Sequence, residues 1–67
     1  MKVVVNSEEF SVEDGDSVAR ALERLQIETV AGTAVAVNRR VVPRDQWDAH
    51  VLESGAEIVV LKATQGG

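Results

Sequence analysis

The sequence predicts an α+β domain in which one helix lies across one face of a mixed sheet of four to five strands. Two observations carry this prediction. The most apolar, β-branched runs lie at 1–5 and 57–62, and the one amphipathic helical segment lies between them. The expected order is two strands, one helix and two or three further strands. With the first and last runs side by side at the sheet centre, this arrangement is a β-grasp.

The N-terminal half is expected to form a hairpin and then the helix. The first strand ends at the turn residues Asn6-Ser7, and 9–12 returns antiparallel to it. Residues 13–16 form an acidic turn whose charges we expect to be solvated, and Asp16 or Ser17 can cap the helix. Helical spacing continues from 17 to 26, which predicts a helix of roughly three turns. Its apolar positions are Val18, Ala21, Leu22 and Leu25, and its polar positions are Arg20, Glu23 and Arg24.

The C-terminal half is expected to supply the remaining strands. Two short β-prone runs, 34–37 and 40–42, are separated by Asn38-Arg39, a two-residue connection that is typical of a hairpin. Pro43 ends the second run because it has no N–H to donate to a ladder. A single helical turn at 44–47 follows, with Trp47 as its apolar anchor, before the longest strand at 57–62.

One helix covers only one face of a sheet, and the central strands do not alternate between apolar and polar residues. If Ile58 and Val60 point toward the helix, then Val59 and Leu61 point away from it, and Val4 joins them from the neighbouring strand. β-branched residues also suit strands whichever way they face. An uncovered apolar patch of this kind marks a contact surface. We therefore predict that Val4, Val59 and Leu61 form a partner interface.

Composition argues against several classes of function. The 67 residues include no cysteine and one histidine, so we predict no metal site and no catalytic residues. Seven basic against eleven acidic residues give a net charge of −4, which does not suit nucleic acid. No apolar run approaches the ~20 residues of a membrane span, and no basic, apolar leader precedes the acidic residues. We expect a cytoplasmic protein that is not an enzyme and binds no cofactor itself.

The last residues carry no packing pattern, and no linker divides the chain. We predict a single domain over 1–67 in which 63–67 form a flexible tail. The final Gly66-Gly67 have no Cβ, so they can thread a narrow channel that any side chain would block. The carboxyl carbon of Gly67 is also unhindered, which suits activation by another protein's ATP. The alternative is an ordinary frayed terminus.

These glycines, the one-helix order and the segment 37–47 resemble the ThiS family, the ubiquitin-like sulfur carriers of thiamine biosynthesis. The specific part is Asn-x-x-Val-Val-Pro-Arg-x-x-Trp at 38–47, which separates this family from other ubiquitin-like sulfur carriers. The resemblance extends over essentially the whole chain, from the strand at Val3 to Gly67.

The resemblance implies a chemistry at the last residue. A ThiF-like adenylyltransferase uses ATP and Mg²⁺ to adenylate the Gly67 carboxylate, and sulfur from a donor protein's persulfide converts it to a thiocarboxylate. A ThiG-like thiazole synthase then takes the sulfur, with Gly66 and Gly67 entering each partner's active site. Two alternatives share parts of this pattern: a molybdopterin-type or other ubiquitin-like carrier or modifier, and a β-grasp interaction module with an inert tail.

Overall fold

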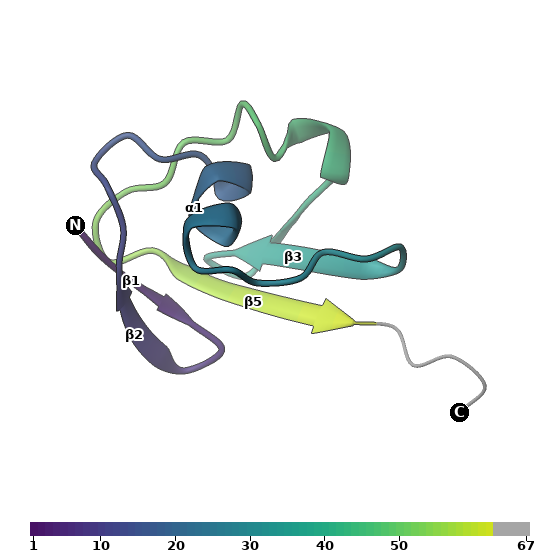
Figure 1. The fold of residues 1–67 in the computed structure, drawn as a ribbon, viewed down its shortest axis with the longest axis horizontal. Coiled ribbons are helices and arrows are strands. Elements are labelled where there is room, and N and C mark those ends of the chain that lie inside the picture. The colour runs from purple at the N-terminus through teal and green to yellow at the C-terminus, as the bar shows by residue number, and fades with distance from the viewer. Residues whose placement is uncertain (63–67) are drawn as a thin grey trace.

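The structure is a computed structural model that describes residues 1–62, and it has the predicted arrangement of elements. The strands are β1 (Lys2–Val5), β2 (Glu8–Ser11), β3 (Thr33–Val37), β4 (Arg40–Val42) and β5 (Glu57–Lys62). The helices are α1 (Val18–Arg24) and the short 3-10 helix η1 (Arg44–Gln46). The strands form one sheet in the order β2-β1-β5-β3-β4, and α1 lies over one of its faces (Figure 1). The predicted fold class is confirmed.

Strand β5 is the centre of the sheet. It pairs in parallel with β1 at Val5↔Ile58 and antiparallel with β3, from Val37↔Ile58 to Thr33↔Lys62. The first and last apolar runs of the sequence therefore lie side by side, as predicted. The β3–β4 hairpin is also confirmed, because Asn38 and Arg39 both have positive φ, of 50° and 71°, as a two-residue hairpin turn requires.

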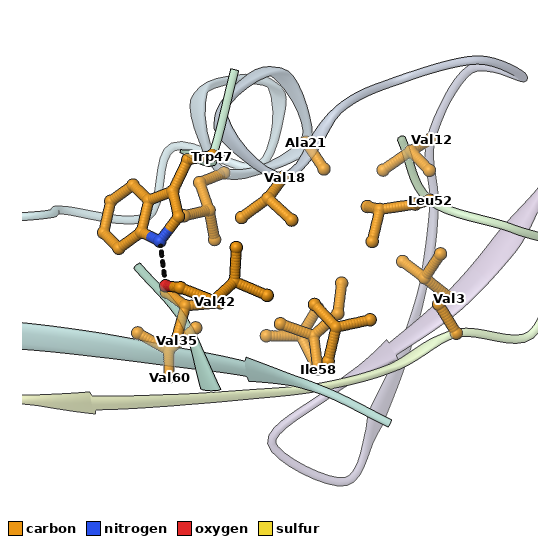
Figure 2. Close-up of a cluster of buried hydrophobic side chains, with 14 residues drawn as sticks. Val3, Val12, Val18, Ala21, Val35, Val42, Trp47, Leu52, Ile58 and Val60 are labelled. Carbon is orange, nitrogen blue, oxygen red and sulfur yellow. Dashed lines mark hydrogen bonds between the residues drawn. The ribbon is translucent and has the colours of Figure 1, made fainter. Parts of the chain in front are cut away.

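The core lies between the helix and one face of the sheet. Figure 2 shows Val18 and Ala21 of α1 facing the sheet residues Val35 and Ile58, and all four are buried. The Trp47 side chain is buried at one end of this core, and its indole Nε1 donates a hydrogen bond of 2.8 Å to the Val42 carbonyl. Trp47 is thus the apolar anchor that the sequence predicts.

The predicted three-turn helix is too long. Ser17 accepts the Arg20 N–H and caps the helix, but α1 has seven residues, about two turns. The helix stops because Gln26 adopts a left-handed φ of 58°. The N–H groups of Gln26 and Ile27 then donate to the carbonyls of Glu23 and Leu22, in the pattern of a Schellman motif.

The prediction that the acidic turn is wholly solvated is wrong for Asp16. Its side chain is buried and accepts hydrogen bonds from the Arg24 guanidinium at 2.8 and 3.3 Å and from the Glu13 N–H at 3.1 Å. The Arg24 guanidinium, which donates to Asp16 Oδ2 and Oδ1, lowers the pKa of the Asp16 carboxyl, and the Glu13 N–H acts in the same direction against the effect of burial. Asp16 therefore ties the turn to the helix.

Candidate functional site

The side chains of β5 alternate between the two faces of the sheet. Ile58 and Val60 are buried on the side of α1, whereas Val59 and Leu61 are 36% and 63% exposed. Successive side chains of a strand point to opposite faces, so Val59 and Leu61 lie on the face opposite α1. The predicted orientation of this strand is confirmed.

The exposed apolar residues of β5 continue across two more strands. Ala36 lies opposite Val59 and Ala34 lies opposite Leu61 in the β3–β5 pairing, and Val41 of β4 lies opposite Ala36. Val41 is 72% exposed, more than any other large apolar residue in the described part of the chain. We call this surface the apolar face. Its members are Ala34, Ala36, Val41, Val59 and Leu61.

Sequence reasoning missed Val41, although the pattern contained the information. A two-residue turn at Asn38-Arg39 fixes the hairpin register, and that register places residue 41 opposite residue 36. Since Val35 and Val37 are buried, Ala36 and Val41 must face outward. The apolar face is therefore broader than the predicted interface and extends to the β4 edge.

Val4 lies at the margin of this surface. It is on the uncovered side of β1 but half-buried, and its register partners are Glu57 on β5 and Glu9 on β2. The charged side chains around it are paired, Lys2 with Glu9 at 3.4 Å and Arg39 with Glu57 at 4.0 Å. The apolar face thus has a charged rim at this end, as protein interfaces commonly do.

Strand β5 also leads to the C-terminal segment. Lys62 is its last residue and directly follows Leu61 of the apolar face. Gly66 and Gly67, which we predict to enter a partner's active site, and the predicted tail at 63–67 lie outside the described residues. Val59 and Leu61 of the apolar face therefore lie on the strand whose last residue, Lys62, precedes the predicted tail.

The segment 38–47, which carries the resemblance, is built into the fold. Arg44 stacks over the Trp47 ring at 4.5 Å, and its guanidinium donates to the carbonyls of Thr29 and Val30 at 3.2 and 2.9 Å. Asn38 accepts the Glu57 N–H at 3.0 Å. These residues fasten η1, the loop before β3 and the start of β5, so the motif stabilises the fold rather than forming a reactive site.

Within residues 1–62 no cluster of three or more His, Cys, Asp or Glu side chains is placed to hold a metal ion. The single histidine, His50, is exposed in the segment between η1 and β5. Over the same residues, no helix has the length and hydropathy needed to cross a membrane. Over the described residues the chain is thus a β-grasp domain of the ubiquitin-like fold class, with an apolar face on the side opposite α1.

Comparison with known proteins resolves this class. The model of the ThiS family matches residues 1–67. Sulfur carrier protein ThiS of Escherichia coli (strain K12) is 33% identical over 67 residues, which cover the whole of both chains. The chain belongs to the ThiS family, whose members are small sulfur carriers and not enzymes.

Two solved structures agree with this assignment. A crystal structure of the thiamine biosynthesis protein ThiS from Geobacter metallireducens superposes with a TM-score of 0.85 at 25% identity and covers both chains completely. A solution structure of a thiamine biosynthesis protein from the same organism gives a TM-score of 0.73 at 25% identity, over all of this chain and 88% of the other. The β-grasp prediction is thereby confirmed.

Proposed function

We propose that this chain carries sulfur for the thiazole ring of thiamine as a thiocarboxylate on Gly67. The observation that supports this most strongly is the match to the ThiS family over residues 1–67. The described structure supports it further, because Val59 and Leu61 are exposed on β5 and Gly67 follows in the sequence five residues beyond Lys62. The residues proposed to dock on partners and the carboxylate proposed to react are then connected through one strand.

Activation of the carboxylate is the first step. A Gly67 carboxylate oxygen attacks the α-phosphorus of ATP, the bond from that phosphorus to the pyrophosphate oxygen breaks, and pyrophosphate leaves as the acyl-adenylate forms. Mg²⁺ and ATP belong to a ThiF-like adenylyltransferase, and Gly66 and Gly67 supply a chain narrow enough to reach its site.

Sulfur enters in the second step. The terminal sulfur of a donor protein's persulfide attacks the acyl carbon, AMP leaves, and an acyl disulfide joins Gly67 to the donor. A thiol then attacks the donor's cysteine sulfur in the acyl disulfide, which releases the thiocarboxylate and leaves a disulfide between that thiol and the donor. The two sulfur atoms of this disulfide supply the two electrons that reduce the transferred sulfur. Tethering this soft nucleophile to a folded domain raises its effective concentration at a ThiG-like thiazole synthase.

The apolar face is the proposed docking surface for these partners. Val59 and Leu61, with Val41 beside them and Val4 at the margin, present apolar side chains that a partner can cover. A carrier that uses one surface for successive partners binds them one at a time. The adenylyltransferase and the thiazole synthase should therefore compete for the same face.

Adenylation tests this function. The chain is incubated with a ThiF-like adenylyltransferase, Mg²⁺ and ATP, and exchange of labelled pyrophosphate into ATP is measured. We expect exchange with the unsubstituted chain, much slower exchange with Gly66→Val, and none when one residue is added after Gly67. Equal exchange with all three would contradict the proposal. Docking without exchange would favour an interaction module, and exchange only with a molybdopterin-type activating enzyme would favour that pathway.

A further inference from the structure

The C-terminal end of β5 is held by a side chain on one of its two edges. Asn6 follows directly after β1, and its carboxamide pairs with both polar backbone groups of Val60. Its Oδ1 accepts the Val60 N–H at 2.8 Å, and its Nδ2 donates to the Val60 carbonyl at 3.3 Å. The Asn6 backbone N–H also donates to the Ile58 carbonyl at 2.9 Å.

This carboxamide takes the place of a strand. The chain turns away after Val5, since Asn6 and Ser7 have φ of 48° and 71°. Asparagine tolerates this left-handed backbone, and its amide has one acceptor and one donor side, as a peptide group does. The Asn6 side chain thereby extends the β1–β5 ladder two residues along β5, from Ile58 to Val60.

Beyond Val60 the hold on β5 is one-sided. In the register of residues 1–62, Leu61 and Lys62 pair with Ala34 and Thr33 of β3, and their other edge has no strand partner. Asn6 therefore marks the last point at which β5 is fixed from both sides before the C-terminal segment. That point is the Val60 backbone, between Val59 and Leu61, the two β5 residues of the apolar face.

We propose that Asn6 is a positioning residue for the reaction at Gly67. By fixing the Val60 peptide groups, it sets the place and direction in which the C-terminal segment starts relative to the apolar face. A partner docked on that face then meets the C-terminal segment at a fixed starting point. This inference rests on the proposed function and concerns the step that follows docking.

The fold supplies a matched control at the other end of the same strand. Asn38 also has a left-handed φ, of 50°, and its Oδ1 accepts the Glu57 N–H at 3.0 Å while its own backbone N–H donates to the Glu57 carbonyl at 2.7 Å. Asn6→Gly and Asn38→Gly each remove a side-chain carboxamide that is hydrogen-bonded to the β5 backbone, and glycine adopts the left-handed backbone without strain. Only Asn6 lies at the end that leads to Gly67.

The experiment compares both variants with the unsubstituted chain as substrates of the adenylyltransferase, at equal concentrations of folded protein. For Asn6→Gly we expect kcat to fall about three- to tenfold, the range for losing one or two net hydrogen bonds, with KM changed less than about twofold. Asn38→Gly should change both constants less than about twofold. Amide hydrogen exchange should accelerate at Val60 in the first variant and at Glu57 in the second.

The outcomes separate the two proposals. If the unsubstituted chain is adenylated and Asn6→Gly keeps its kcat, Asn6 has no positioning role. An increase in KM alone, or an equal loss in kcat for Asn38→Gly, would likewise overturn it, because the effect would be on docking or on general stability. Absence of adenylation of the unsubstituted chain would contradict the proposed function, and this inference with it.

Discussion

Leu61→Glu is expected to block docking while leaving the fold intact, whereas Val60→Glu one residue earlier is expected to unfold the domain. Leu61 is 63% exposed, so only about a third of its side chain is buried. Full burial of a leucine contributes about 2–3 kcal/mol, so the substitution costs about 1 kcal/mol of the free energy of unfolding. Val60 is 8% exposed, and a glutamate there loses the whole burial and desolvates a carboxylate. That cost exceeds the ~3–5 kcal/mol that a core of this size supplies.

Two assays read out these substitutions. Trp47, the one tryptophan, is buried, so its fluorescence in a urea titration reports unfolding. Isothermal titration with the adenylyltransferase reports docking, and Leu61→Glu should weaken it by more than about tenfold, because the interface would bury a charge. Val51→Glu is the control, since Val51 is 57% exposed but pairs with Ser17 beside the start of α1, on the helix side.

Either of two results would refute this reasoning. If Leu61→Glu unfolds as readily as Val60→Glu, residue 61 is part of the core and the strand faces are assigned incorrectly. If Leu61→Glu is stable but binds the adenylyltransferase as tightly as Val51→Glu does, the apolar face is not the docking surface.

Three further predictions concern stability. The Arg24 guanidinium lowers the pKa of Asp16, so the ion pair stabilises the fold at pH values above the ordinary aspartate pKa of about 3.9, and this stability is lost as the pH falls through the lowered pKa. Urea titrations at a series of pH values should therefore show that the free energy of unfolding falls less at acid pH in Asp16→Asn than in the unsubstituted chain. Gln26→Gly should raise the free energy of unfolding by roughly 0.5–1 kcal/mol in the same titration, because glycine adopts the left-handed φ without a steric cost, and a decrease would contradict the assigned cap. Trp47→Phe should lower it by roughly 1–3 kcal/mol, because the Val42 carbonyl loses its buried donor; an unchanged midpoint would show that this hydrogen bond contributes nothing.

Most of the fold could be predicted because local patterns and the final arrangement agree. The strand at 57–62 has the residues of a buried central strand. Because successive side chains of a strand point to opposite faces, its sequence also determines which side chains meet the helix. The two-residue turn at 38–39 and the proline at 43 delimit β4 without knowledge of the rest of the chain. The same register, followed one step further, would have placed Val41 on the apolar face.

The features that could not be predicted depend on contacts between distant residues or on unusual backbone positions. Gln26 ends α1 where sequence rules expect glycine or asparagine, so the helical pattern continues past the true end. Asp16 is buried because Arg24, eight residues later, reaches back to it. Asn6 is recognisable as a turn residue, but its contact with Val60, 54 residues away, exists only once β1 and β5 pair.

Sulfur carriage at Gly67 is tested most directly by the intact mass of the untagged chain after incubation with the adenylyltransferase, Mg²⁺, ATP and a persulfide donor with a thiol. The predicted result is a mass gain equal to replacing one oxygen by sulfur, assigned by fragmentation to Gly67. An unchanged mass, with an adenylyltransferase that is active on another carrier, would contradict it.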